Sequence, residues 1–224
     1  LWVKIIGGSG KDQSNSIEIN SDGNLVVSGY FSSTMQVGST VLTSNGSKDA
    51  YVTMLTPAGD FLWAKKIGGI GEELSNGLAT SNGSIYFAGS FEGTVDMDPG
   101  PGMVNVSSNG LKDIFLLKLN SSGDLIWNTT YGGVHIDECT SVYADQGYLY
   151  ATGSFRYQVD FDPGINVVEL SSLGGSPDIF ISKFGDFNCA DAYLKVDSIS
   201  DITCTDPGFI SLSFENAMYP IIYD

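Results

Sequence analysis

Apolar residues in this chain fall in short runs, and glycine and polar residues separate one run from the next. Residues 73–131 show the pattern: a weakly alternating run begins at Ser75, and strongly apolar runs follow at 84–91, 113–120 and 125–131. Turn sequences such as Ser81-Asn-Gly-Ser stand between them. No stretch repeats its apolar residues with the 3.6-residue period of an amphipathic helix. The pattern therefore predicts an all-β fold of short strands joined by tight turns.

The same order of runs occurs three times along the chain. Three related sequence motifs begin at Trp2, Trp63 and Trp127, and each motif ends in a glycine pair. The tryptophans are separated by 61 and 64 residues. An apolar run with Gly-Tyr-Phe or Gly-Ser-Phe follows each motif. A further apolar run that begins with aspartate comes after it. Repeats of this length are single supersecondary units that stack on copies of themselves.

Four strands in each repeat, arranged in tandem, are typical of the blades of a β-propeller. We therefore predict a partial β-propeller over residues 1–187, with three four-stranded antiparallel blades from the repeats 2–62, 63–126 and 127–187. Three blades are too few for a ring, because propellers use about four to eight. The sequence also begins at Leu1 inside the repeated motif, so we expect a longer parent protein.

Residues 188–224 have a different composition and predict the first strands of a β-sandwich-like, Ig-like module that is cut short. Cys189 and Cys204 flank the start of this segment, and they could form a disulfide in an oxidising compartment. Cys139 stands in an alternating apolar run, which favours a buried free thiol.

Charge narrows the range of partners. The chain has 10 basic and 26 acidic residues and a net charge of −16. Such a surface repels phosphate backbones and anionic lipid, so we expect no nucleic-acid binding. No apolar run approaches the roughly 20 residues of a membrane span, so we expect no membrane insertion. Acidity favours solubility, and divalent cation binding is a second interpretation.

Four aspartates are the candidate metal ligands. They stand in pairs two residues apart beside Pro-Gly turns in the second and third repeats, and that spacing puts both carboxylates of a pair on one face of a strand. Carboxylate pairs favour a hard cation, so calcium is the candidate cofactor. The alternative is that the aspartates initiate the turns. The four residues are Asp96, Asp98, Asp160 and Asp162.

Residues present in every repeat are better explained by architecture than by ligand binding. Aspartates at the head of the third strand predict turn caps that accept backbone N–H groups. The glycine pairs predict close approaches between blades. The tryptophans are expected in the blade core. The repeated positions are Trp2, Trp63, Trp127, Asp49, Asp113 and Asp178.

The repeats resemble the β-propeller repeats of secreted and surface bacterial proteins, through the Trp-…-Gly-Gly, Gly-Ser-Phe, Val-Asp-Phe-Asp-Pro-Gly and Asp-Ile-Phe-Leu-Leu-Lys-Leu phrases over residues 1–184. Residues 199–212 resemble adhesin modules of gliding bacteria. These resemblances imply a secreted or cell-surface, multidomain adhesin-type protein that binds protein or glycan.

We therefore expect a non-enzymatic binding or adhesion scaffold. One alternative is a carbohydrate-acting enzyme that uses carboxylates at the channel mouth of the propeller. His135 is the only histidine, and no nucleophile motif accompanies it. A second alternative is a purely structural spacer.

Overall fold

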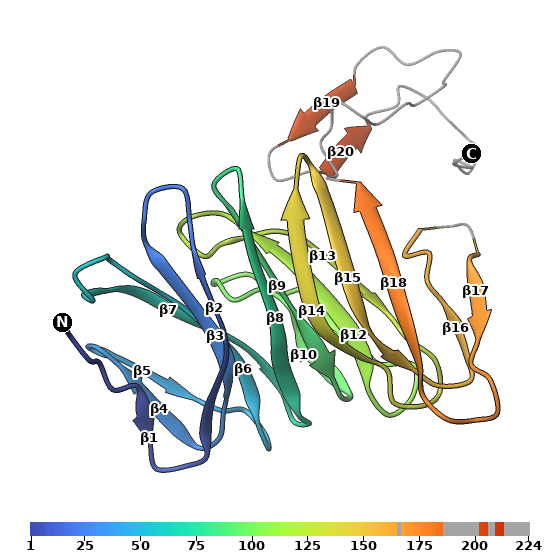
Figure 1. Cartoon of the computed structure of the whole chain (residues 1–224), viewed down its shortest axis with the longest axis horizontal. Coiled ribbons are helices and arrows are strands. Elements are labelled where there is room, and N and C mark those ends of the chain that lie inside the picture. The colour runs from blue at the N-terminus through green and yellow to red at the C-terminus, as the bar shows by residue number, and fades with distance from the viewer. Residues whose placement is uncertain (165–166, 186–201, 206–208, 213–224) are drawn as a thin grey trace.

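The computed structural model describes residues 1–164, 167–185, 202–205 and 209–212. In this part of the chain all regular structure is β-strand and the strands pair antiparallel in small sheets (Figure 1). The prediction of an all-β, propeller-like fold is confirmed. A hairpin of β19 (Ile202–Thr205) and β20 (Phe209–Leu212) lies within the segment 188–224. The rest of that segment lies outside the described residues, as does Cys189.

Three successive meanders form the main sheets. The first contains β2 (Asp12–Ile19), β3 (Leu25–Phe31), β6 (Asp49–Leu55) and β7 (Phe61–Gly69). The second contains β8 (Glu73–Ser81), β9 (Ser84–Phe91), β12 (Asp113–Leu119) and β13 (Leu125–Tyr131). The third contains β14 (Glu138–Asp145), β15 (Tyr148–Phe155) and β18 (Asp178–Gly185). The prediction of four strands per blade is thus met in the second sheet and in the meander of the first, whereas the third sheet has three strands in the described part of the chain.

A small hairpin stands between the second and third strand of each sheet. These hairpins are β4 (Thr34–Val37) with β5 (Thr40–Thr43), β10 (Thr94–Asp96) with β11 (Asn105–Ser107), and β16 (Gln158–Asp160) with β17 (Glu169–Ser171). The glycine pair at the end of β7 pairs with β10, and β1 (Gly7–Gly8) pairs with β4 in the same way. The first two hairpins therefore pair with the end of the preceding Trp-…-Gly-Gly segment, and the β10–β11 hairpin extends the first sheet to six strands.

Sheets and sequence repeats are out of phase. Trp63 lies in β7, which pairs with β6 and is the last strand of the first sheet. The predicted repeat that begins at residue 63 therefore starts with a strand that belongs to the sheet before it. A tight turn at 56–60 joins β6 to β7, and short turns make consecutive strands antiparallel neighbours. The structural units are consequently residues 12–69, 73–131 and 138–185.

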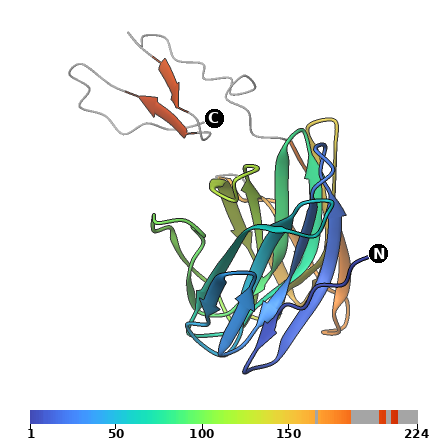
Figure 2. The same ribbon diagram turned by 90° about the vertical axis from the view of Figure 1, so that its left-hand side faces the viewer.

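The sheets pack face to face, and their first strands β2, β8 and β14 lie side by side (Figure 1). Figure 2 shows the first sheet from its outer side, with its strands next to one another. One apolar cluster fills the space between the first and second sheets, and a second cluster fills the space between the second and third. All seven residues of β6 and of β12 are buried, because a neighbouring strand lies on each side and another sheet lies against them.

Candidate functional site

The junction between the first two sheets is closed by a glycine pair and two buried carboxylates. Asp49 accepts hydrogen bonds from the Asn45 backbone N–H at 3.0 Å and from Lys66 Nζ at 2.6 Å. A Cβ atom on Gly68 would lie only 2.0 Å from Asp49 Oδ2, so only glycine fits there. Gly69 in turn donates its N–H to Glu73 Oε2 at 2.7 Å. The glycine pair thus lets two sheets approach around two carboxylates.

The second junction repeats this arrangement. Asn109 donates its backbone N–H to Asp113 Oδ2 at 2.8 Å, and Gly133 donates to Asp137 Oδ2 at 2.7 Å. In the third sheet Asp178 accepts from the Leu173 N–H at 2.6 Å. Asp49, Asp113 and Asp178 therefore make the backbone hydrogen bonds expected of turn caps.

Sequence reasoning missed the carboxylate that follows each glycine pair. Asp12, Glu73 and Asp137 each stand four residues after the second glycine of a pair, and each accepts that glycine's N–H. The regular spacing was the available signal, but the alternation of Asp and Glu and the presence of further acidic neighbours obscured it.

Burial changes the protonation of these groups. Loss of solvent raises the pKa of Glu73 to about 7, and the nearby Asp49 charge adds to the rise. Desolvation likewise raises the pKa of Asp113 to about 6, with a contribution from Asp137, whose own pKa is also raised by burial. Glu73 and Asp137 are fully buried. These carboxylates are closed off from solvent and from any substrate, so they have a structural role in the junction.

The tryptophans were predicted in the blade core. Trp63 and Trp127 are partly buried and pack against the apolar clusters between the sheets. Trp2 and Trp63 also reach the outer turn of a neighbouring sheet. Trp63 in β7 donates its indole N–H to the Ser121 carbonyl oxygen at 3.0 Å, and Trp2 donates to the Pro57 oxygen at 3.1 Å. Trp2 is 41% exposed. The indole N–H needs a polar partner, which a turn carbonyl at the sheet edge supplies. Trp127 packs edge-on against Tyr86.

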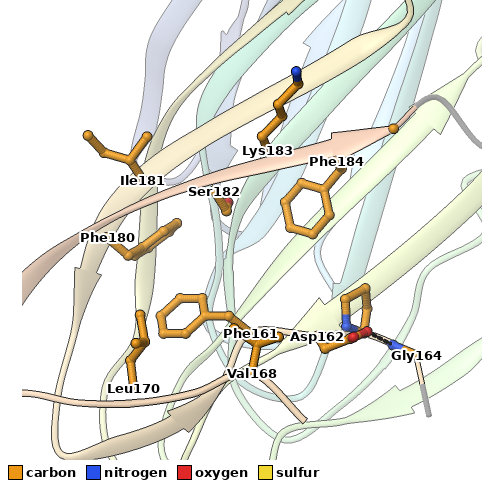
Figure 3. Close-up of a pocket in the computed structure, with 12 residues that line it drawn as sticks. Phe161, Asp162, Gly164, Val168, Leu170, Phe180, Ile181, Ser182, Lys183 and Phe184 are labelled. Atoms are coloured by element: carbon orange, nitrogen blue, oxygen red, sulfur yellow. Dashed lines mark hydrogen bonds between the residues drawn. The ribbon is translucent and has the colours of Figure 1, made fainter. Parts of the chain in front are cut away.

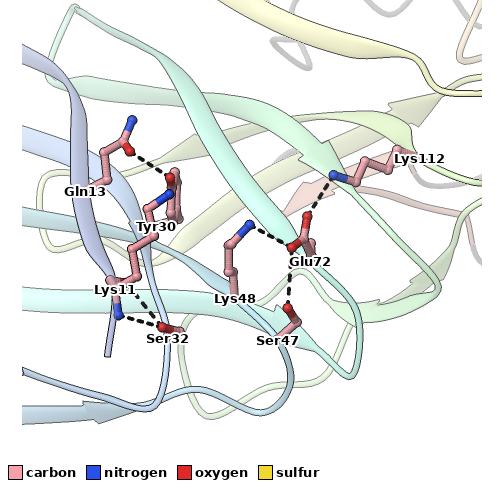
Figure 4. Close-up of polar contacts among 8 residues, drawn as sticks. All are labelled: Lys11, Gln13, Tyr30, Ser32, Ser47, Lys48, Glu72 and Lys112. Atoms are coloured by element: carbon pink, nitrogen blue, oxygen red, sulfur yellow. Dashed lines mark hydrogen bonds and ion pairs between the residues drawn. The ribbon is translucent and has the colours of Figure 1, made fainter. Parts of the chain in front are cut away.

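A strip of polar side chains crosses the loop end of the first two sheets, which is the end where β2, β6, β8 and β12 begin (lower end in Figure 1). At its centre, Glu72 accepts hydrogen bonds from Lys48 Nζ at 2.7 Å and from Lys112 Nζ at 3.0 Å (Figure 4). These two lysines lower the pKa of Glu72 to about 2. Glu72 is therefore ionised and joins two sheets. The polar strip consists of Lys11, Gln13, Tyr30, Lys48, Glu72 and Lys112.

Tyr30 lies at one end of the polar strip. The ammonium groups of Lys11 and Lys48 stand 5.5 and 5.4 Å from the centre of its ring, and its hydroxyl donates to Gln13 Oε1 at 2.7 Å. The ring itself is buried, so the lysine stems and ammonium groups cover it. The strip therefore presents fixed cations beside one carboxylate.

The polar strip combines repeated and variable positions, because Lys48 and Lys112 are equivalent lysines of the first two repeats whereas other strip positions change. Serines 90 and 154 replace Tyr30 in the later repeats. The position before the second junction carboxylate is Lys11, then Glu72, then Ile136. Side chains that vary between otherwise similar repeats, such as Tyr30 and Glu72, are not required by the architecture, so this surface is the candidate functional site.

His135 and Tyr157 extend the loop end toward the third sheet. Their rings stack with centres 4.3 Å apart, and Tyr157 is about half exposed. The Lys112 N–H donates to the His135 carbonyl oxygen at 3.4 Å, which places the stack beside the polar strip. A shallow cavity adjoins the stack and is lined in part by Gly133, Gln158 and Ser171. An exposed aromatic face beside polar groups is suited to stacking of a planar group or a sugar ring.

The four candidate metal ligands accept backbone hydrogen bonds within the hairpin loops. Asp96 Oδ1 accepts the N–H groups of Asp98 at 3.1 Å and Val104 at 2.8 Å, and Asp98 Oδ1 accepts the Gly100 N–H at 2.7 Å. Asp160 and Asp162 make the same bonds in the third sheet. Within the described residues no group of three or more His, Cys, Asp or Glu side chains could hold a metal ion. The turn-initiating alternative thus has direct support, and calcium binding stays a prediction.

The cysteines divide between described and undescribed parts of the chain. Cys139 is free and fully buried, and burial raises the pKa of its thiol to about 12. The predicted Cys189–Cys204 disulfide lies outside the residues whose side chains are described.

Fold and junctions together define an all-β, propeller-like repeat protein. No protein-family model matches the chain. An uncharacterized WD repeat-containing protein, L264 of Acanthamoeba polyphaga mimivirus, is 26% identical over 127 residues, a match that covers 50% of this chain and 9% of that protein. WD repeats are four-stranded propeller blades, so this distant similarity points to the same type of repeat. The described residues include no helix with the length and hydrophobicity of a membrane span.

Proposed function

We propose that the protein is a non-enzymatic binding and adhesion scaffold of an exported, cell-surface protein, and that its loop end binds a protein or glycan. One observation supports the proposal: Glu72, His135 and Tyr157, whose side chains have no equivalent in the other repeats, lie at this end beside two lysines held by Glu72. Propellers hold their loops on a rigid frame, which favours binding.

The chemistry of the loop end favours a ligand rich in hydroxyl or carboxylate groups. Lys48 and Lys112 are held by Glu72 and supply charged donors. Tyr157 supplies an exposed ring. Donors beside an aromatic face match a glycan, whose hydroxyls accept hydrogen bonds and whose ring stacks on an aromatic side chain.

Glycan-array binding followed by titration with the best-binding glycan tests the proposal. We expect Tyr157→Ala and Glu72→Gln each to weaken binding at least tenfold, because they remove the stacking ring and the group that positions two lysines. Ser122→Ala, in the turn between β12 and β13, is the control and should leave affinity unchanged. Unchanged affinity in both loop-end variants would contradict the assignment, and absence of glycan and protein ligands would favour the spacer alternative.

The enzyme alternative requires carboxylates that a substrate can reach. The carboxylates with raised pKa, Glu73 and Asp113, are buried in the junctions, and Glu72 is paired with two lysines. Release of reducing ends from polysaccharides by the purified protein is the assay that would support the enzyme instead.

A further inference from the structure

Two aromatic residues of the second junction stand where the first junction has glycines. His135 follows its glycine pair at the position of Gly71, and Tyr157 follows β15 at the position of Gly93. The backbone supports this equivalence, because the carbonyl oxygens of His135 and Gly71 each accept a backbone N–H from the equivalent lysine at 3.4 Å. The two aromatic rings are in contact, with centres 4.3 Å apart. Both replacements therefore alter the same place in the fold.

The backbone of Tyr157 has a conformation that favours glycine. Its φ angle is +57°, in the left-handed region, and Gly93 at the equivalent position has a φ angle of +74°. Bulky residues rarely adopt this conformation, and residues that do so concentrate at ligand-binding sites. Because the second repeat makes the same turn with glycine, the turn does not explain the tyrosine ring.

The Cβ atom of His135 changes the space between the two loops. A Cβ atom on Gly71 would lie 2.4 Å from the carbonyl oxygen of Glu92, so the first junction has no room for a side chain there. His135 carries such an atom, and the carbonyl of Arg156 at the equivalent place must lie farther away. The loop that contains Tyr157 is consequently set back from the segment that follows the glycine pair.

A cavity of about 470 Å³ lies between these two segments. Gly133 and His135 line one side of it, and Tyr157 and Gln158 line the other. Strand pairing differs here too, because β10 pairs with the glycine pair of β7, whereas among the described residues β16 pairs with β17 alone. The cavity volume is within the range of about 300–1,000 Å³ that is common for small-molecule sites.

The hairpin that forms one wall of the cavity is anchored by Phe161. The centre of its ring lies 5.1 Å from that of Phe180 and 5.5 Å from that of Tyr131. Figure 3 shows Phe161 and Phe180 on the side of the hairpin that faces β18. Phe161 belongs to the buried cluster between the second and third sheets. This wall is therefore fixed before a ligand binds, which lowers the entropic cost of binding.

The lining of the cavity is aromatic and polar. Among the described residues that line it there is no Asp, Glu, Lys or Arg, so a charged ligand would find no ionic partner there. Asn109, Ser171 and Ser172 supply amide and hydroxyl groups, which donate and accept hydrogen bonds. His135 stacks on the Tyr157 ring, and Tyr157 is still 49% exposed. A neutral sugar matches this lining, because it has hydroxyls of both kinds and an apolar face that stacks on an aromatic ring.

We propose that this cavity binds one neutral hexopyranose unit, stacked on the ring of Tyr157, with Asn109, Ser171 and Ser172 beside its hydroxyls. The inference rests on the proposed binding function and names the class of ligand that the loop end takes. The unfavourable backbone conformation of Tyr157 is retained because it places the ring against the sugar. All of the residues involved belong to the junction between the second and third sheets.

Proton NMR of the full 224-residue chain tests the proposal, because His135 is the only histidine and its ring signals report on the cavity. Titration with the methyl glycosides of glucose, galactose and mannose should shift these signals in a saturable way for at least one sugar. The methyl uronides of the same sugars differ by a carboxylate. Each uronide should bind at least tenfold more weakly than its neutral counterpart.

Tyr157→Gly separates sugar binding from folding. Glycine suits the positive φ angle, so we expect a melting temperature no lower than that of the parent and sugar binding at least tenfold weaker. Ser33→Gly is the matched control, since Ser33 has a φ angle of +64° at the equivalent position of the first repeat. This variant should leave sugar binding unchanged.

The inference would be overturned by the absence of a shift with all three neutral glycosides, by uronides that bind as tightly, or by sugar binding that survives in Tyr157→Gly. A glycan array that still shows binding in any of these cases would leave the proposed function standing. Absence of every glycan and protein ligand would remove the proposed function as well.

Discussion

Trp63 donates its indole N–H to the carbonyl oxygen of Ser121, 3.0 Å away, and thereby joins the last strand of the first sheet to the outer turn of the second. The ring also packs on that turn, since a Cβ atom on Gly123 would lie 3.0 Å from Trp63 Cζ3. Trp2 makes the same contacts with the turn at Pro57 and Gly59. The most regular element of the repeat is therefore a contact between neighbouring sheets.

Replacing Trp63 should weaken this contact in two steps. Trp63→Phe keeps a ring but loses the hydrogen bond, so we expect a loss of about 1 kcal/mol in the free energy of unfolding. Trp63→Ala also loses the packing, and we expect about 3 kcal/mol. Urea unfolding followed by circular dichroism measures both. Equal losses in the two variants would show that the hydrogen bond, and not the ring, carries the contact.

Gly68 should tolerate no side chain. Gly68→Ala brings Cβ to within 2.0 Å of Asp49 Oδ2, so the buried carboxylate or the strand must move. We expect a loss of about 2–3 kcal/mol of stability. Gly185→Ala is the matched control, because a Cβ there meets no atom of the described residues within 4 Å. Thermal unfolding of both variants should separate them by several degrees, and equal melting temperatures would contradict the close approach.

Stability should fall as the pH rises from about 4.5 to about 7. The pKa of Glu73 is about 7 in the folded protein against an ordinary value of 4.5, so the folded state binds the proton more tightly. Its contribution is complete below pH 4.5 and is lost as the pH rises through 7. Glu73→Gln keeps an acceptor for the Gly69 N–H without a charge. We expect it to be more stable than the parent by about 2 kcal/mol at pH 8 and equal to it at pH 4.

Glu72 should give the opposite dependence of stability on pH. Lys48 and Lys112 lower its pKa to about 2, so its contribution is present above pH 4.5 and is lost as the pH falls toward 2. Glu72→Gln should reduce the loss of stability below pH 4.5 and leave the slope above that pH unchanged. Urea titrations from pH 2 to pH 8 test both glutamates, and a Glu72→Gln profile that still falls as steeply below pH 4.5 would contradict the ion-pair account.

The hairpin aspartates should tolerate amide replacement better than truncation. Asp96 accepts two backbone N–H groups, and Asn at this position keeps an acceptor oxygen. We expect Asp96→Ala to lower the free energy of unfolding by about 1–2 kcal/mol and Asp96→Asn by less than half of that. Melting with and without millimolar calcium tests the remaining prediction, since a bound ion would raise the melting temperature of the parent but not of Asp98→Asn.

Local chemistry was predictable from the sequence, whereas relations between sheets were not. Asp49 at the start of a strand predicted a turn cap, and the Pro-Gly sequences after Asp98 and Asp162 predicted turns. The sequence did not show where each sheet begins within the repeat. The spacing of the tryptophans is the same whether the strand of Trp63 belongs to the sheet before it or to the sheet after it. The polar strip was also hidden, since Tyr30, Glu72 and Lys112 are far apart along the chain and meet only when the sheets pack.

The most direct test of the central claim, that consecutive repeats pack as adjacent sheets, is a disulfide across one junction. Ser75 Oγ of the second sheet donates to Ser28 Oγ of the first at 3.1 Å, and both side chains are fully buried. Ser28→Cys combined with Ser75→Cys should form this disulfide within one chain in the folded protein, as peptide mapping would show. Thiols that stay reduced, or that link only after unfolding, would contradict the packing of the two sheets.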